Sequence, residues 1–166
     1  MNRISQLISN FGLQPHPEGG YFKETYRSDG LIPKISLPSH YPGNRNYATA
    51  IYFLLTSDTF SAFHRIKQDE IWHFYEGSPI KLHVISETGA YTEQLIGTNF
   101  SAGEVPQFVV PGNHWFAAET VEPNSYSFVG CTVSPGFDFA DFVMADGTGL
   151  AAQFPDLGDV IGRLTR

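Results

Sequence analysis

Short runs of alternating apolar and polar residues, separated by turns rich in glycine and proline, constrain this fold most. A strand shows such alternation because successive side chains point to opposite faces. The runs that fit a strand are residues 21–26, 47–55, 59–66, 70–75, 80–85, 91–96, 107–110, 115–119 and 125–133. Short strands at this regular spacing predict a β-sandwich or β-barrel.

Composition agrees with an all-β class. The chain holds 14 Phe and 8 Tyr beside 16 Gly and 11 Pro, which favours strands and turns. Helical spacing occurs only near the ends, over residues 4–11 and 157–164. No boundary or low-complexity tract interrupts the 166 residues, so we expect a single domain over residues 1–166 with short terminal helices.

Charge and cysteine content limit the binding partners and the cellular compartment that we expect for this chain. The net charge is −7, from 17 acidic and 10 basic residues, and no basic cluster offsets it, which disfavours a nucleic-acid partner. No apolar run has the length of a signal peptide or a membrane span. Cys131 is the single cysteine, so no internal disulfide forms. We expect a soluble, cytoplasmic protein with no membrane partner.

The segment from His64 to Gly77 resembles the first cupin motif, His-x-His, three or four residues, Glu, six residues and Gly. His64, Glu70 and Gly77 match it, whereas Ile66 stands in the second histidine position. Residues 103–116 resemble the second motif in degraded form, with Phe116 in its histidine position.

Residues 16–21 (His-Pro-Glu-Gly-Gly-Tyr), 51–55, 69–73 and 129–139 are more specific. Together they are similar to one cupin family of unknown function, Cupin_5, over nearly the whole chain. The resemblance implies a cupin double-stranded β-helix, or jelly-roll barrel, commonly paired as a dimer, with a deep pocket and no agreed substrate.

His64 and Glu70 are the candidate catalytic pair. Strand alternation sends Trp72 and Phe74 inward with Glu70, so the carboxyl is expected among aromatic walls, where burial raises its pKa. A nearby His64 would then be the more natural base, and the pair could move a proton without a metal.

In metal-binding cupins the resemblance would supply three histidines and a glutamate. Here Ile66 and Phe116 occupy two of those positions, and two protein ligands seldom hold a divalent ion tightly. We therefore predict no cofactor, and a divalent metal stays a disfavoured alternative, with His64, Glu70 and His114 as its ligands.

Further residues are candidates for the pocket wall or mouth. Tyr52 and Trp115 are contributors whose facing the sequence leaves open. Arg45 follows a long loop and could bind an anion at the mouth, although a surface ion pair explains it equally well. His83 shares a strand face with Lys81, between the apolar Leu82 and Val84, and is expected to face solvent.

For two further segments, residues 16–18 and 135–142, the sequence favours a structural role over a functional one. His16 and Glu18 lie in a turn whose Pro and Gly already explain a tight entry to the sheet, which we favour over substrate contact. Residues 135–142 read as a final edge strand with Asp138 and Asp141 solvated, and Phe137 could cap one end of the pocket.

The sequence thus predicts a metal-independent enzyme that acts on a small polar molecule, sugar- or nucleotide-like, by epimerase or isomerase chemistry. A non-catalytic small-molecule binding module and a metal-dependent cupin enzyme are the alternatives. A homodimer is also expected, because the strand at residues 47–55 is apolar on both faces.

Overall fold

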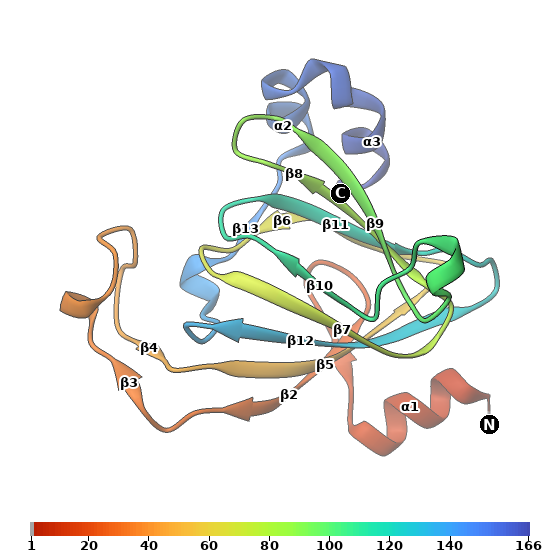
Figure 1. Ribbon diagram of the computed structural model, residues 1–166, viewed down its shortest axis with the longest axis horizontal. Helices are drawn as coiled ribbons and strands as arrows, with labels where there is room; N and C mark the ends of the chain where they lie inside the picture. The colour runs from red at the N-terminus through yellow and green to blue at the C-terminus, as the bar shows by residue number, and fades with distance from the viewer. Residues whose placement is uncertain (1) are drawn as a thin grey trace.

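The computed structural model describes residues 2–166, and two antiparallel sheets make up its centre (Figure 1). In spatial order, the six-stranded sheet consists of β1 (Gln14–Pro15), β2 (Tyr21–Arg27), β5 (Thr49–Thr56), β12 (Tyr126–Ser134), β7 (Asp69–Gly77) and β10 (Gln107–Val110). The five-stranded sheet consists of β13 (Val143–Met144), β6 (Phe60–Arg65), β11 (Trp115–Thr120), β8 (Ile80–Ile85) and β9 (Tyr91–Ile96). A small separate sheet pairs β3 (Leu31–Ile32) with β4 (Arg45–Asn46).

Every strand predicted from alternation between residues 21 and 133 is present, with ends that differ by a few residues. The predicted terminal helices are also confirmed as α1 (Arg3–Phe11) and α3 (Gly158–Arg163). α2 (Gly147–Gln153) was not predicted, because two glycines weaken its helical pattern. The 3₁₀ helices are η1 (Lys34–Ser36), η2 (Phe100–Ala102), η3 (Phe139–Asp141) and η4 (Pro155–Leu157).

The main core fills the space between the two sheets. Inward side chains of β5, β7 and β12 meet those of β8 and β11, among them Phe53, Trp72, Leu82, Phe116 and Val129. Each of these is almost fully buried. One end of the same interior stays open, and that end contains the cavity described below.

Helices cover the outer faces of both sheets. α2 and α3 pack on the five-stranded sheet, where Ile161 and Leu164 contact a cluster that includes Phe63. α1 packs on the six-stranded sheet through Leu7, next to Leu54 of β5. Among residues 2–166 no helix combines the length and the apolar character that a bilayer span requires.

α1 covers the outward face of β5, the face that the sequence predicts a second chain would cover in a dimer. The outward side chains Tyr52 and Leu54 of β5 are covered by α1 and its cluster, so their apolar character is satisfied within one chain. Tyr26 and Tyr75 on the same sheet remain about half exposed, at 55% and 49%. Homodimerisation stays a prediction.

We expect Leu7→Ala to undock α1, because Leu7 is only 2% exposed and fills the space between helix and sheet. The free energy of unfolding should fall by about 2–4 kcal/mol in urea denaturation. Ile35→Ala is the control, since Ile35 is 94% exposed, and it should change stability by less than about 0.5 kcal/mol. Equal stability of Leu7→Ala and the wild type would contradict the docking.

Candidate functional site

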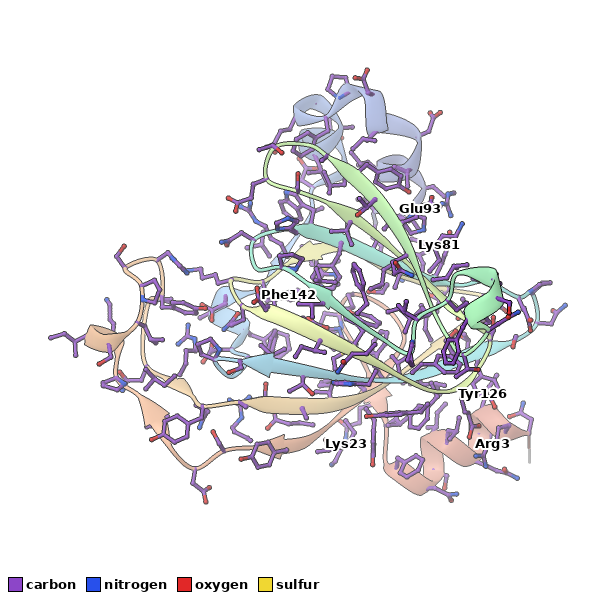
Figure 2. The ribbon with its side chains drawn as sticks, viewed as in Figure 1. Arg3, Lys23, Lys81, Glu93, Tyr126 and Phe142 are labelled. Atoms are coloured by element: carbon purple, nitrogen blue, oxygen red, sulfur yellow. The ribbon has the colours of Figure 1, made fainter. Side chains whose placement is uncertain are left out.

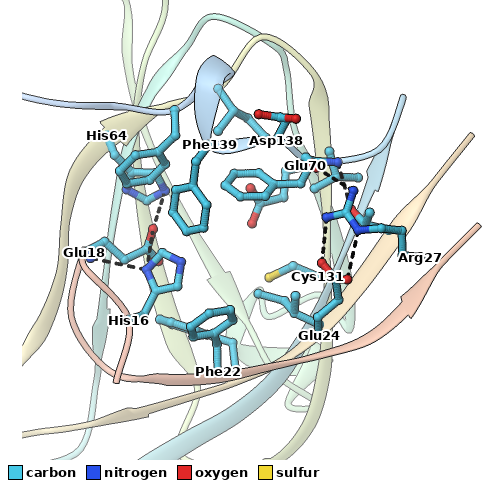
Figure 3. A pocket seen from close by; sticks show the side chains of 17 residues that line it. His16, Glu18, Phe22, Glu24, Arg27, His64, Glu70, Cys131, Asp138 and Phe139 are labelled. Carbon is cyan, nitrogen blue, oxygen red and sulfur yellow. Dashed lines mark hydrogen bonds and ion pairs between the residues drawn. The ribbon is translucent and has the colours of Figure 1, made fainter. Parts of the chain in front are cut away.

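A cavity of about 300 Å³ enters the open end of the interior (Figure 3). Its walls come from β2, β5, β6, β7 and β12, from the turn before β2 and from the segment 137–142, which we call the roof. The lining residues are His16, Glu18, Phe22, Glu24, Arg27, Thr49, Ile51, Phe53, His64, Ile66, Glu70, Cys131, Val133, Phe137, Asp138, Phe139 and Phe142.

A buried ion pair lies on one side of the cavity. Nε2 of His64 lies 2.9 Å from Oε2 of Glu18, and Ser61 donates a hydrogen bond of 2.9 Å to the other carboxylate oxygen. Nδ1 of His64 contacts the carbonyl oxygen of Ala62 at 2.7 Å. Both nitrogens of the His64 ring are therefore engaged.

Local backbone features bring Glu18 to His64. Gly19 and Gly20 have φ values of 118° and 73°, which side chains disfavour, and a Cβ on Gly19 would lie 2.1 Å from the carbonyl oxygen of Phe60. The turn can thus pack closely against β6, where the backbone N–H of Ala62 donates a hydrogen bond to the backbone carbonyl oxygen of Glu18.

A β-bulge in β6 completes the arrangement. Strict alternation would place Ser61 and His64 on opposite faces of the strand. The pairing with β11 shifts register between these two residues, so the extra residue turns both side chains toward Glu18.

Electrostatics favour the protonated form of His64. Burial lowers the pKa of His64, but the charge and hydrogen bond of Glu18 outweigh it and raise the pKa above its ordinary value. Burial raises the pKa of Glu18, while the charge and hydrogen bond of His64 bring it below its ordinary value. Because both ring nitrogens already have partners, His64 does not fit the role of base that the sequence suggested.

Glu70 on β7 is the titratable group at the centre of the site. Its side chain is buried and lines the same cavity. Burial, aided by the negative charge of Glu18 and opposed by His64, raises the pKa of Glu70 to about 7. Cys131 hydrogen-bonds to Glu70, and burial raises the pKa of this thiol well above its ordinary value, so the thiol stays protonated.

His16 is a neutral imidazole at the cavity wall. Burial lowers its pKa more than the charge of Glu18 raises it. Its Nδ1 accepts a hydrogen bond of 3.3 Å from the backbone N–H of Glu18, which leaves the proton on Nε2. The sequence pattern favours a structural role for this turn, yet both His16 and Glu18 line the cavity.

The roof differs from the edge strand that was predicted. It folds into η3, with the Asp138 side chain accepting a hydrogen bond from the backbone N–H of Ala140. Phe137, Phe139 and Phe142 supply aromatic surface to the cavity, and the Phe142 ring lies 5.3 Å from the His64 ring. A role for Phe137 at the pocket thus agrees with the observed lining.

The prediction that Asp141 is solvated is wrong, because its side chain is buried. Arg45 binds both carboxylate oxygens of Asp141 at 2.6 Å, so the ion-pair alternative holds for Arg45, in buried rather than surface form, and the pocket-mouth alternative does not. Gln68 donates a further hydrogen bond of 2.7 Å to Asp141. These contacts anchor η3 to β4 and to the turn before β7.

Arg27 and Glu24 form the opposite side of the cavity, and the sequence analysis did not single them out. Arg27 binds both oxygens of Glu24, at 3.0 and 2.8 Å, and donates from Nη1 to Asn46 and to the carbonyl of Phe137. Strict alternation along β2 hides this pair, because a register shift follows Glu24.

The predicted aromatic walls lie elsewhere. Trp72 and Phe74 belong to the main core, and Trp72 is only 1% exposed, packed edge-on against Phe53 and Phe116. Alternation gave the inward direction of Trp72 correctly, but the core fills the space beside it. Neither residue lines the cavity.

Tyr52, Trp115 and His114 also lie away from the cavity. Tyr52 is part of the cluster beneath α1, and Trp115 is on the outer face of the five-stranded sheet with Arg65 4.5 Å from its ring centre. His114 is in the turn before β11, where its Nδ1 contacts the carbonyl of Gly112 at 3.1 Å.

His83 is buried rather than solvent-facing. It is 0% exposed, and its ring nitrogens contact the Tyr91 hydroxyl at 2.6 Å and Glu119 at 3.0 Å. α3 covers this position, since Arg163 binds Glu119, and the strand pattern alone could not show that cover.

The residues present do not fit a cupin metal ion. Ile66 lines the cavity with an apolar side chain, and the Phe116 ring packs 4.1 Å from the His64 ring. Among residues 2–166 no three His, Cys, Asp or Glu side chains converge in a way that could hold a metal. His114 does not join His64 and Glu70, so the alternative ligand set is not assembled.

We expect Arg45→Met to destabilise the protein by about 3–5 kcal/mol, because it removes the cation that binds both oxygens of the buried Asp141 carboxylate. Gln68 and the more distant Lys67, at 3.9 Å, are the partners that remain. Arg3→Met removes the same charge from the periphery of the molecule (Figure 2), where Arg3 pairs with Glu76, and should change stability far less than Arg45→Met does. Chemical denaturation compares the two. Similar losses in both variants would contradict the anchoring role of Arg45.

Glu70 should make stability fall with rising pH. Its pKa of about 7 in the folded chain exceeds the ordinary value of 4.5, so folded Glu70 keeps a proton that the unfolded chain releases between these pH values. The favourable contribution is complete below pH 4.5 and is lost as pH rises through 7. Glu70→Gln should therefore gain about 2–3 kcal/mol relative to wild type between pH 5 and pH 8 in urea unfolding. Parallel pH profiles for the two proteins would refute this.

Known relatives share both sequence and fold. Residues 5–145 match the family described as Cupin superfamily (DUF985). The uncharacterized protein YML079W of Saccharomyces cerevisiae is 34% identical over 154 residues, which covers 87% of this chain and 76% of the yeast protein.

Solved structures give the same result. A hypothetical protein from Leishmania major is 32% identical, with a TM-score of 0.89 and 99% of each chain covered. Protein SO0799 from Shewanella oneidensis is 35% identical, with a TM-score of 0.87, covering 100% of this chain and 99% of that one. Bacillus subtilis oxalate decarboxylase shares only the fold, at 14% identity and a TM-score of 0.56, over 95% of this chain and 38% of that one. The cupin fold is thus confirmed, and this chain belongs to the Cupin superfamily (DUF985) family.

Proposed function

We propose that the protein is a metal-independent enzyme that isomerises or epimerises a small carbonyl compound in the barrel cavity by moving a proton. The observation that carries this proposal is Glu70, a buried carboxyl with a pKa of about 7 that lines the cavity. A group that titrates near neutral pH exchanges protons readily in both directions.

Glu70 would act as the single acid and base among the protein's side chains. In its carboxylate form it takes a proton from the carbon beside the substrate carbonyl, and the C–H electron pair moves into the new C=C bond while the carbonyl oxygen becomes negative. In isomerisation, the proton returns to the former carbonyl carbon, the proton of the neighbouring hydroxyl passes to the negative oxygen, and the carbonyl forms at the neighbouring carbon. In epimerisation, Glu70 keeps the proton that it took and a water molecule gives a proton to the opposite face of the same carbon, which restores the carbonyl. Atoms and electrons balance without a cofactor.

His16 and the ion pair would support this step. Neutral His16 carries its proton on Nε2, a form suited to donate a hydrogen bond to the developing oxyanion. Glu18 holds that tautomer through its backbone N–H, and its negative charge helps keep the pKa of Glu70 high. His64 holds Glu18 in place.

A non-catalytic binding module is the second candidate. The observation that favours it is the engagement of both His64 ring nitrogens, which leaves Glu70 without the second catalytic base that the sequence predicted. The aromatic lining would serve ligand binding equally well.

The test is hydrogen exchange from D₂O into a panel of small aldoses, ketoses and amino ketones, followed by NMR and mass spectrometry. We expect the wild type to introduce deuterium beside the carbonyl of at least one compound, and Glu70→Gln to lose about 10²-fold or more of that rate. Glu122→Gln, an exposed position away from the cavity, is the matched control and should keep the full rate.

Exchange that persists in Glu70→Gln would refute the catalytic assignment. Compounds that bind the wild type without any exchange would leave the binding module as the function.

A further inference from the structure

We propose that the ligand of this cavity is a small ring-bearing organic cation, whose protonated amine lies among the cavity carboxylates and whose ring packs on the phenylalanines. The inference rests on the proposed function, since it names the substrate class of the same site. It replaces the broader sugar- or nucleotide-like expectation with a molecule that carries positive charge and no phosphate.

Acidic groups outnumber free basic groups along the lining. The carboxyls are Glu18, Glu24, Glu70 and Asp138. Glu18 is paired with His64 at 2.9 Å, and Glu24 is paired with Arg27 at 2.8 Å. Each pair is close to neutral, so Glu70 and Asp138 determine the sign of the remaining charge.

An anion would find few donors in this cavity. Arg27 already donates to both oxygens of Glu24 and, from Nη1, to Asn46 and Phe137. Both ring nitrogens of His64 are engaged as well. Binding a phosphate or carboxylate would require breaking these contacts, and the buried groups left behind would be unpaired.

Glu70 is the acidic group that lacks a strong partner. It is 8% exposed, and within residues 2–166 its hydrogen-bond partner is the Cys131 thiol, a weak donor. A buried carboxylate is costly without a charged or strongly donating neighbour. An ammonium group would supply both the opposite charge and strong hydrogen bonds.

The aromatic surface also suits a cation. Phe22 and Phe139 lie on opposite sides of the opening, with Glu18 and His16 on one flank and Glu24 and Arg27 on the other (Figure 3). The Phe139 ring lies 4.9 Å from Phe137 and 5.8 Å from Phe142. Such rings attract cations through their faces and pack against a ligand ring.

A cationic substrate would also activate its own base. In the free protein, Glu70 faces the negative Glu18, the positive His64 and the neutral Cys131 thiol. A positive charge beside Glu70 stabilises its carboxylate and lowers its pKa. Binding would therefore convert the half-protonated group into the base that the reaction needs.

Benzylamine, benzyl alcohol and benzoate test the charge preference, because they offer similar rings with a positive, neutral or negative group. NMR titrations at pH 7 would give a Kd for each. We expect benzylamine to bind at least ~10-fold more tightly than benzoate, with benzyl alcohol between them. Benzoate that binds as tightly as benzylamine, or benzylamine that does not bind at millimolar concentration, would overturn the proposal.

Variants locate the preference within the cavity. Glu70→Gln and the exposed Asp138→Asn should each reduce the benzylamine-to-benzoate preference at least ~3-fold. Asp159→Asn removes the same charge from α3, outside the cavity, and should leave the preference unchanged. An unchanged preference in both cavity variants would overturn the proposal.

The two proposals fail separately. An amine preference without any deuterium exchange would overturn the enzyme and keep the ligand class. Deuterium exchange into neutral sugars without an amine preference would overturn the ligand class and keep the enzyme.

Discussion

The contact between Glu18 and His64 is the interaction on which the site depends. It joins the turn before β2 to β6, at 2.9 Å, inside a part of the barrel where both side chains are buried. A buried ion pair stabilises little overall, because desolvation offsets most of the attraction between the charges. Its value here lies in geometry and electrostatics. It places His16 at the cavity wall and puts a fixed negative charge near Glu70.

The roof is held by a second buried pair that works in the same way. Arg45 and Gln68 bind Asp141, and through it they hold the short helix that carries Phe139. The cavity thus has a polar flank fixed by Glu18 and an aromatic cover fixed by Asp141. Between them, Glu70 is left with a weak thiol partner, which makes it the group free to respond to a ligand.

The sequence predicts the strands well because alternation depends only on neighbouring residues. Motif spacing also identified His64 and Glu70, both of which line the cavity. Alternation could not exclude Trp72 from the cavity wall. It shows that a side chain points into the barrel, but not whether other side chains fill the space beside it.

The remaining errors have tertiary causes. The bulge in β6 brings Ser61 to the same carboxylate as His64, and a bulge depends on the partner strand. The burial of Asp141 depends on Arg45, which is 96 residues away in sequence. The cavity positions of Glu18 and Arg27 likewise follow from contacts between distant segments.

The central claim is that Glu70 is a buried acid whose pKa is set by its surroundings. The most direct test follows the ¹³C signal of the Glu70 side-chain carboxyl by NMR as a function of pH, with assignment from the spectrum that Glu70→Gln lacks. We predict a titration midpoint near pH 7. A midpoint near the ordinary glutamate value of 4.5 would contradict the account.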